Sequence, residues 1–479
     1  MKQDNKGITA KKEENMSEWY EQICLKSELV EFSTVKGCMV IRPRGYEIWE
    51  KIKQHFEKTI NKPLGVKNAY FPLFIPESFF HKEAKHAKGF SPEVAWIDKE
   101  LTKGGERLAI RPTSETIMYD SYSRWIRSYR DLPLKINQWA NVVRWETKAT
   151  RLFLRSREFL WQEGHNVYET ETECEKETIE IIKKYKKLVE ELLGIPVLIG
   201  KKSEKEKFAG ASKTYTIEAF MPDGKALQCG TSHNLGQKFG KAFNISFLGR
   251  DEKKHTPFQN SWGLSTRLIG GLIMTHSDDK GLILPPKIAE NKIVIIPLLF
   301  KGKEKKVLEK AKEIKKQLNK FNPILDDSED YSPGYKFSEY ELKGTPLRIE
   351  IGPRDLENQE IILVRRDTKE KKPIKIKNLT KEIPKILELM QNELFGKAKK
   401  RMESETIEIK TKEEFKKAIK NKKLIKMSWC NERNCEKNIK DQTGATTRCI
   451  LLNETTKPTE NCPFCNKKSK CIMYFSKSY

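Results

Sequence analysis

Long apolar runs are missing from this sequence. The longest candidate, Ile293–Phe300 (IVIIPLLF), is too short to span a bilayer and contains a proline. The first fifteen residues, MKQDNKGITAKKEEN, lack the apolar core of a secretory signal peptide. We therefore expect a cytoplasmic protein that has no membrane partner.

Acidic side chains are scarce relative to basic ones. The chain carries 67 Asp and Glu against 92 Lys and Arg, a formal net charge of +25. A field of this sign suits a polyphosphate partner and makes binding to it sensitive to salt. The alternative is a generally Lys-rich proteome, because the excess lysines are spread over the whole chain. The charge therefore supports nucleic-acid binding without proving it.

Cysteine is sparse until residue 430, after which six of the ten cysteines fall within Cys430–Cys471. In a large chain expected to be cytosolic, such clustering favours a metal site over disulfides. The pairs Cys430/Cys435 and Cys462/Cys465 can together hold one tetrahedral Zn²⁺, and a site with four filled positions is structural. Two alternatives remain: Cys471 replaces Cys462 or Cys465, or the thiols are reduced and carry no metal.

The chain divides into three predicted units: 1–285, 286–396 and 397–479. Its length leaves room for about two to four domains. The first unit ends at the adjacent Pro285 and Pro286, and double prolines interrupt regular structure.

The second unit alternates strands and helices, which predicts a small α/β domain. It opens with the strand-like Ile293–Leu299. Helices are predicted at Val307–Leu318 and at Lys381–Phe395, the latter with Thr380 as N-cap. The Lys-rich span Gly396–Glu405 is either a linker or a solvated helix.

Two further helices carry end signals. Residues 173–193 are acidic at their start and precede Gly194, which is typical of a helix C-terminus. In the third unit, Thr411 and Glu414 form a capping-box pattern ahead of a short helix.

The span Asn141–His165 predicts a hairpin that binds an anion. Two strand-like stretches flank a loop that carries three arginines, Arg151, Arg155 and Arg157. Arg144 and Glu146 lie two positions apart, so on a strand they face the same way, beside the loop arginines. Guanidinium is planar, always charged and bidentate toward phosphate. A salt-laced surface hairpin is the alternative.

Two other segments have polar residues at useful spacings. In RPTSE, Thr113 and Glu115 can reach one pocket, where the carboxylate would receive an ammonium; a plain turn leading into a helix is the alternative. In NSWGLSTR, Gly263 allows close approach, and Arg267 at a helix start can face a phosphate.

Together these segments resemble motifs 2 and 3 of the class II aminoacyl-tRNA synthetases, and GCMVIRPRGYEIW places Pro43 where motif 1 has its proline. The likeness is strongest to prolyl-tRNA synthetases of the archaeal and eukaryotic type. The segments that carry it are RPTSE, VVRWETKATRLFLRSREFLWQEGH, CGTSHNLGQ, QNSWGLSTR and KGTPLRIEIGPRDL. The resemblance implies an α+β class II catalytic domain with an antiparallel sheet, an α/β anticodon-binding domain and a small C-terminal α/β zinc-binding domain.

The resemblance also implies an activity. L-Proline would be activated with ATP and Mg²⁺ to prolyl-adenylate and then transferred to tRNA(Pro) by a homodimer. Attack of the carboxylate on the α-phosphate places charge on nonbridging oxygens, so catalysis is mostly positioning and electrostatics. A structural Zn²⁺ and packing of Tyr479 back on the catalytic domain are implied as well.

Site residues follow from the resemblance, position by position. The catalytic residues implied are Arg144, Glu146 and Arg267. The ATP-binding residues implied are Arg144, Arg155, Phe159, Gln228, Thr231, Ser265 and Arg267. The proline-binding residues implied are Thr113, Glu115, Arg144, Trp161, Glu163, His165 and His233, beneath a lid that carries Phe90 and Glu93. The anticodon-reading residues implied are Glu341, Arg348 and Arg354, for which a charged, solvated strand edge is the alternative.

Two rival functions are consistent with the same motifs. A threonyl enzyme would need a catalytic zinc in the first unit, where Cys174, Cys229, His165 and His233 are scattered through other motifs. A non-catalytic RNA-binding paralogue would have lost its phosphate-binding arginines, whereas this chain keeps them.

Overall fold

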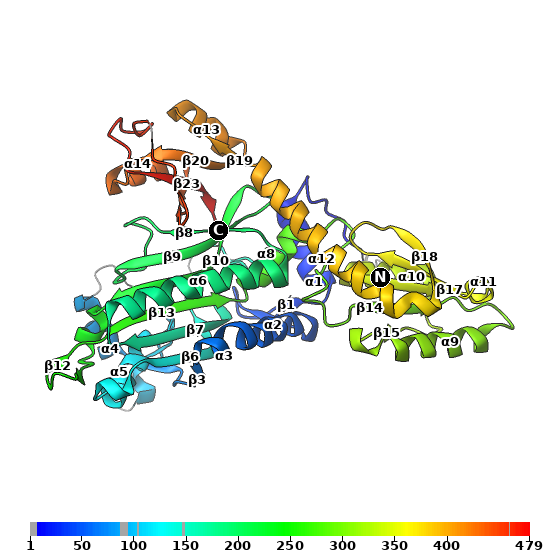
Figure 1. Cartoon of the computed structure of the whole chain (residues 1–479), viewed down its shortest axis with the longest axis horizontal. Coiled ribbons are helices and arrows are strands. Elements are labelled where there is room, and N and C mark those ends of the chain that lie inside the picture. The colour runs from blue at the N-terminus through cyan, green and yellow to red at the C-terminus, as the bar shows by residue number, and fades with distance from the viewer. Residues whose placement is uncertain (1–6, 87–93, 103–104, 146–148, 459) are drawn as a thin grey trace.

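The computed structural model describes residues 7–86, 94–102, 105–145, 149–458 and 460–479. Helices and strands form three regions (Figure 1). None of the helices in the described residues is both long and apolar enough to cross a membrane.

A large antiparallel sheet organises the first region. Its strands are β6 (Leu134–Val143), β7 (Glu158–Tyr168), β13 (Phe258–Ser265), β10 (Lys225–Gly236), β9 (Lys213–Phe220) and β8 (Val197–Lys201), in that spatial order. The short β3 (Lys67–Asn68) adds to β6 in parallel. The predicted antiparallel sheet is therefore confirmed.

Helix α6 (Glu171–Leu193) covers one face of this sheet (Figure 1). It begins with a capping box between Thr170 and Glu173 and ends at Gly194, which is left-handed. Tyr185 of α6 donates a hydrogen bond to Gln162 Oε1 on β7. Gln162 and the residues two and four positions away from it on β7 therefore face the helix, and the residues between them face the opposite side of the sheet.

Smaller elements surround the sheet. The helices are α1 (Met16–Lys26), α2 (Pro43–Phe56) continued by a π-helical turn and α3 (Lys62–Leu64), α4 (Glu77–His86), α5 (Glu115–Trp125), α7 (Lys238–Ala242) and α8 (Arg267–His276). The additional strands pair as β1 (Val30–Phe32) with β2 (Met39–Ile41), β4 (Phe74–Pro76) with β5 (Leu108–Ile110), and β11 (Phe247–Leu248) with β12 (Lys254–His255). Pro43 is the first residue of α2, where its missing N–H costs nothing.

A five-stranded sheet forms the second region. Its spatial order is β15 (Ile324–Leu325), β14 (Ile293–Pro297), β16 (Leu347–Ile351), β17 (Glu360–Arg365) and β18 (Lys371–Lys375). The helices of the region are α9 (Glu304–Gln317), α10 (Pro333–Lys343), α11 (Pro353–Glu357) and α12 (Leu379–Ser404). The predicted alternation of strands and helices is confirmed.

Helix α12 corrects one prediction. Its N-cap is Asn378, so Thr380 lies inside the first turn and does not cap the helix. The helix continues without interruption through 396–404, which makes that span a helix and not a flexible linker. A Cβ at Gly396 would meet open space, so packing does not require glycine there. Helix α12 connects the second region to the third (Figure 1).

The third region extends the large sheet. Strands β19 (Thr406–Glu408), β20 (Leu424–Trp429) and β23 (Cys471–Ser478) lie side by side, with α13 (Lys412–Lys420), α14 (Arg433–Thr443) and β21 (Thr446–Thr447) beside them. The predicted capping box of Thr411 and Glu414 opens α13. β23 pairs in parallel with β10, and β22 (Ile450–Leu451) pairs with β8. The following Tyr479 packs on the core of the first region, as the resemblance implied.

Candidate active site

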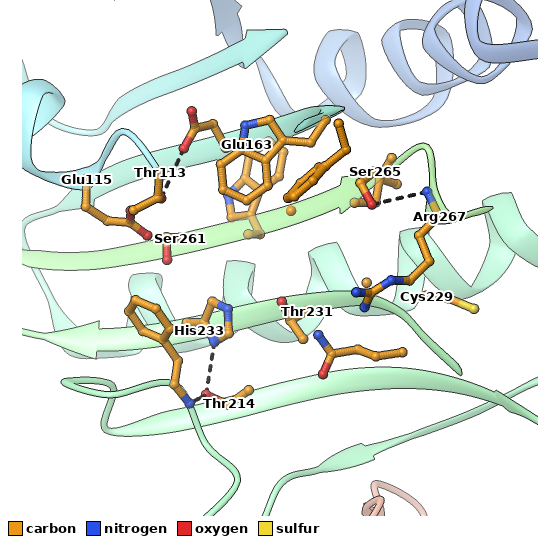
Figure 2. Close-up of a pocket in the computed structure, with 18 of the residues that line it drawn as sticks. Thr113, Glu115, Glu163, Thr214, Cys229, Thr231, His233, Ser261, Ser265 and Arg267 are labelled. Atoms are coloured by element: carbon orange, nitrogen blue, oxygen red, sulfur yellow. Dashed lines mark hydrogen bonds between the residues drawn. The ribbon is translucent and has the colours of Figure 1, made fainter. Parts of the chain in front are cut away.

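A cavity of about 540 Å³ opens on the face of the sheet opposite α6 (Figure 2). Its lining residues are Thr113, Glu115, Arg144, Phe159, Trp161, Glu163, His165, Glu206, Phe208, Thr214, Gln228, Cys229, Gly230, Thr231, His233, Ser261, Trp262, Gly263, Leu264, Ser265 and Arg267. Twelve of the thirteen described residues predicted for catalysis, ATP or proline lie in this one wall.

Strand periodicity builds the floor of the cavity. On β7, Trp161, Glu163 and His165 alternate with residues that face α6, so all three side chains point into the cavity. Their cross-strand partners on β13 are Ser265, Gly263 and Ser261, and β10 adds Thr231 and His233. Between Glu163 and His165, a Cβ on Gly164 would lie 2.2 Å from the Trp262 ring, so the close fit to β13 requires glycine.

Glu163 and His165 form a buried polar network at one end of the cavity. Glu163 accepts hydrogen bonds from the Ser114 N–H (3.1 Å) and from Gln138 Nε2 (3.0 Å), and its Oε2 lies 3.2 Å from His165 Nε2. The other ring nitrogen of His165 lies 3.1 Å from the Tyr119 hydroxyl. Every polar atom of this pair therefore has a partner, which fixes both side chains.

The two carboxylates and the imidazole influence one another. Burial alone raises the pKa of Glu163, but the hydrogen bonds from His165, Ser114 and Gln138 outweigh it and lower that pKa. Burial lowers the pKa of His165, and its bond to Glu163 with the nearby charge of Glu115 raises it overall. Thr113 donates a hydrogen bond to Glu115 in the same corner. Two carboxylates facing one imidazolium leave this end negative, which suits a cationic amine.

His233 is held neutral on the opposite wall. Burial, with repulsion from His165 and Lys202, lowers its pKa to about 3. Its Nδ1 lies 2.9 Å from Thr214 Oγ1, and its ring centroid is 4.8 Å from that of Phe208. His233 thus contributes a neutral ring and hydrogen-bonding nitrogens to the site, as predicted for a binding group.

Arg267 lies at the other end of the cavity (Figure 2), and Arg144 lines the same cavity. Arg267 is the first residue of α8, and its Nε donates to Leu154 O at 3.1 Å. Arg144 Nε donates to Pro112 O at 3.1 Å, and its guanidinium lies 5.6 Å and 5.4 Å from the Phe159 and Trp161 ring centroids. Burial and the neighbouring Arg144 lower the pKa of Arg267. Crowded cations at a helix N-terminus favour an anion, and phosphate suits them best.

One predicted ATP-binding residue, Arg155, lies outside the lining of this cavity. Arg155 lines a second cavity of about 390 Å³ beside the first, together with Arg151, Tyr20 and Tyr479. It is nevertheless close enough to Arg267 to lower the pKa of that residue. Glu146 lies outside the described residues, as do Phe90 and Glu93 of the predicted lid.

Sequence reasoning missed part of the cavity wall. Glu206 and Phe208 come from the loop between β8 and β9, which carries no motif. Thr214 was missed although it lies directly across from His233 in the β9–β10 ladder. Alternation along β9 was the available signal, since Thr214 and Thr216 share a face with Glu218.

Four cysteines meet in the third region. The Sγ atoms of Cys430, Cys435, Cys462 and Cys465 all lie within 4.8 Å of one another. The Cys435–Cys462 and Cys430–Cys465 sulfur distances are 3.6 and 3.5 Å. Thiolates bound to one Zn²⁺ at about 2.3 Å would lie about 3.8 Å apart, so this donor set fits a tetrahedral zinc. Cys471 points instead toward Trp429 O.

Two of the three predicted anticodon residues contact each other. Arg348 Nη1 lies 3.1 Å from Glu341 Oε1, and Arg348 also bonds Glu350 and stacks 4.2 Å from the Phe337 ring. Arg348 is only 7% exposed, so the alternative of a solvated strand edge is wrong for it. Arg354 is exposed on α11.

The antiparallel sheet, with Arg144 and Arg267 at one end of its cavity, has the features of a class II aminoacyl-tRNA synthetase core. Residues 96–276 match the tRNA synthetase class II core domain (G, H, P, S and T), and residues 292–386 match the anticodon binding domain. Residues 412–479 match the prolyl-tRNA synthetase C-terminal domain. Within the described residues, the cysteines and histidines of the core form no zinc cluster of the kind that the threonyl alternative needs.

Whole-chain relatives narrow the class to one family. A proline–tRNA ligase of Alkaliphilus oremlandii is 50% identical over 474 residues, which cover 98% of this chain and 97% of that protein. Proline–tRNA ligase 2 of Clostridioides difficile is 47% identical over 477 residues, with 98% and 97% covered. The crystal structure of prolyl-tRNA synthetase from Cryptosporidium parvum complexed with L-proline and AMP superposes with a TM-score of 0.93, at 42% identity over 99% of this chain and 97% of that one. The chain belongs to the prolyl-tRNA synthetase family.

Proposed function

We propose that this protein activates L-proline with ATP and transfers it to the 3′ end of tRNA(Pro). One observation carries the proposal: a single cavity has the buried carboxylates of Glu115 and Glu163 at one end and the partly buried guanidinium groups of Arg144 and Arg267 at the other. An amino acid offers an amine to the first end and a carboxylate toward the second, where ATP phosphates would lie.

The amino-acid end would bind the proline amine. Glu115 and Thr113 face it from the start of α5, and Glu163 and His165 hold the opposite wall. Trp161 and His233 would close around the apolar ring, which offers little else to recognise. Arg144 lies between the two ends and would contact both the substrate carboxylate and the α-phosphate.

The nucleotide end would orient ATP for in-line attack. The proline carboxylate oxygen attacks the α-phosphorus, a new P–O bond forms, and pyrophosphate leaves with the bonding electrons. Arg144 and Arg267 stabilise the charge on the phosphate oxygens, and Phe159 stacks on adenine. The remaining contacts with the nucleotide would come from Arg155, Gln228, Thr231, Ser265 and, outside the described residues, Glu146. Mg²⁺ bound with ATP would neutralise the outer phosphates.

Transfer to tRNA needs recognition at a distance. The 3′-terminal ribose hydroxyl attacks the prolyl carbonyl, and AMP leaves. Glu341, Arg348 and Arg354 would read the guanines of the proline anticodon, because Arg pairs with guanine O6 and N7. Arg348 must exchange its present carboxylate partners for a base to do so.

Several further features belong to the same proposal. A structural Zn²⁺ would be held by Cys430, Cys435, Cys462 and Cys465. The chain would form three domains, a catalytic domain at 1–285, an anticodon-binding domain at 286–396 and a C-terminal domain at 397–479. Apolar side chains exposed on and near the β1–β2 hairpin support a homodimer through this face: Phe32, Val35, Val40 and Tyr46. The protein would act in the cytoplasm.

The archaeal and eukaryotic type remains the subtype we propose, although the reported bacterial relatives do not distinguish it. Between β7 and β13 the chain forms only α6, α7 and the strands β8–β12, which leaves no inserted domain. The third region and the likeness to the Cryptosporidium structure, at 43% identity with halofuginone and AMPPNP bound, support the same type.

The test is ATP–pyrophosphate exchange measured with each of the twenty amino acids in turn. Proline should give the highest kcat/KM by a wide margin. Exchange with threonine or serine but not with proline would overturn the assignment, and no exchange with any amino acid would favour the non-catalytic alternative.

A further inference from the structure

The loop 202–212 between β8 and β9 forms the part of the cavity wall that carries no motif. It contributes Glu206 and Phe208 to the lining of the cavity. Phe208 packs on the His233 ring, and its N–H donates to Thr214 Oγ1 at 3.0 Å. Because Thr214 Oγ1 also lies 2.9 Å from His233 Nδ1, the position of this loop sets the position of a residue proposed to contact proline.

The base of this loop is held by the third region of the chain. Ser203 Oγ donates to Glu436 Oε1 at 3.0 Å and lies 3.1 Å from Thr447 Oγ1. The same oxygen accepts the N–H of Glu206 at 3.1 Å. Arg433 Nη2 donates to the backbone carbonyl of Glu204 at 3.3 Å. Three contacts therefore connect α14 and β21 with one short turn of the catalytic region, and the Glu206 N–H bond closes that turn on itself.

Arg448 completes this connection. Its guanidinium is 3.8 Å from Glu206 Oε2 and 3.6 Å from Glu218 Oε2, and it donates to Thr446 Oγ1 at 2.6 Å. Glu218 is fully buried and also receives Lys202 Nζ at 2.6 Å. Two cations and two carboxylates thus alternate in a cluster that is buried except at Glu206, whose side chain is 26% exposed, and Arg448, 4% exposed, is the member contributed by the third region.

The cluster adjoins the cavity floor. Glu218 pairs across the β9–β10 ladder with Gln228, so both side chains lie on the same face of the sheet. Glu206 is itself a lining residue. Removing the Arg448 charge would leave Glu206 and Glu218 without a cation between them in a low-dielectric environment, where unpaired carboxylates are unfavourable. Glu206 can avoid this unfavourable burial by turning its carboxylate toward solvent, and the loop 202–212 would then move with it.

We propose that Arg448 is a positioning residue for the amino-acid end of the site. Through Glu206 it holds the loop 202–208 against His233, so that the third region sets the affinity of the catalytic region for its amino acid. The inference rests on the proposed function, because proline is the ligand whose binding is affected. Such coupling needs no contact between Arg448 and proline. It needs only a loop that Arg448 holds at one side and that packs on the proline site at the other.

The experiment compares Arg448→Met with Arg366→Met in the full-length protein. Arg366 is a matched control: it is also 4% exposed and also joins another region to the catalytic one, through Asp278 at 2.6 and 3.0 Å. ATP–pyrophosphate exchange gives KM for proline, KM for ATP and kcat. Arg448→Met should raise the proline KM roughly tenfold, the effect of one lost charge-assisted contact, while kcat and the ATP KM change less than about twofold. Arg366→Met should leave the proline KM unchanged.

Two more variants keep the inference falsifiable if Arg448→Met does not fold. Ser203→Ala removes the loop side of the same connection and should raise the proline KM several-fold. Arg448→Lys keeps the charge and should restore most of the proline affinity. A proline KM within twofold of wild type in Ser203→Ala would overturn the inference, as would equal rises in both KM values with a lower Tm. If wild type shows no proline-dependent exchange, the proposed function itself fails instead.

Discussion

His165 Nε2 lies 3.2 Å from Glu163 Oε2, and the two side chains are 1% and 2% exposed. The pair forms because the residues are two apart on β7 and so face the same side of the sheet. The Ser114 N–H and Gln138 fix the carboxylate, and Tyr119 fixes the imidazole. A buried ion pair this fully satisfied makes the stability of the site depend on pH.

The first prediction follows from the direction of the His165 shift. Its pKa is above 6.5 in the folded state, so protonation stabilises the fold below pH 6.5, and this contribution is lost as the pH rises through the folded-state pKa. The difference in unfolding free energy between wild type and His165→Asn should therefore shrink as the pH rises from about 6 to about 9. Urea denaturation at several pH values measures it.

His233→Asn is the control for this experiment. The pKa of His233 is about 3, so its charge does not change over the same range. The loss of unfolding free energy caused by His233→Asn should be constant between about pH 6 and pH 9. A cost of His165→Asn that is equally constant would contradict a charged His165.

The second prediction concerns the guanidinium groups of the nucleotide end. Arg144→Ala and Arg267→Ala should each lower kcat/KM for adenylate formation by roughly a hundredfold or more, because each removes a donor to the transition-state charge. Arg124→Ala, on the exposed surface of α5, serves as the control and should retain full activity. Exchange rates close to wild type in both active-site variants would refute their placement at ATP.

Zinc content gives the third prediction. Elemental analysis of protein purified without chelator should find close to one Zn per chain. Cys430→Ser or Cys465→Ser should release the metal and lower the Tm, since binding energy of a structural site is folding energy. Cys471→Ser should retain it because its sulfur lies outside the four-sulfur cluster. Loss of zinc from Cys471→Ser would instead support the alternative in which Cys471 replaces Cys462 or Cys465 as a ligand.

The fourth prediction separates tRNA recognition from activation. Arg348→Ala should raise KM for tRNA, at a cost of about 1–3 kcal/mol per lost base contact, while proline-dependent exchange without tRNA stays intact. Transcripts with altered anticodon guanines are charged in parallel by the wild-type enzyme. Equal charging of altered and unaltered transcripts would argue against direct readout.

The fifth prediction concerns errors. Alanine is smaller than proline and enters the same pocket, and a missing methylene is worth only about 1–3 kcal/mol. Since the described chain between β7 and β13 holds no separate hydrolytic domain, we expect measurable activation of alanine or cysteine without clearance of mischarged tRNA. Pre-formed Ala-tRNA(Pro) should deacylate in the presence of enzyme at the spontaneous rate. Faster loss that disappears on active-site mutation would reveal an editing site.

Local sequence predicted the parts of this site that depend on strand periodicity. Trp161, Glu163 and His165 share a face because of their spacing, and Arg267 starts a helix where a phosphate site was predicted. The spacing of Cys430, Cys435, Cys462 and Cys465 predicted that they would cluster, and their Sγ atoms lie within 4.8 Å of one another. In each case the chemistry is carried by residues close together in the chain.

What sequence could not predict depends on contacts across the chain. Ser203 and Glu436 are 233 positions apart, and neither belongs to a motif. The same holds for Arg448, whose partners lie on the β8–β9 loop and on β9. The failed N-cap at Thr380 has a different cause: the turn Ile376–Asn378 runs directly into the helix, which therefore begins before Thr380, and Asn378 at the N-cap position makes no side-chain capping hydrogen bond.

The parallel pairing of β23 with β10 affects how this chain folds during synthesis. Lys225 pairs with Lys477 and Ala226 with Ser478, although translation of the second and third regions separates them. The large sheet therefore acquires one of its strands only after nearly all of the chain has been made, and such non-local pairing is slow. A nascent chain that has finished its catalytic region has most of β10 paired with β9 and β13, but it should stay protease-sensitive at Lys225 and Ala226 until β23 has been made.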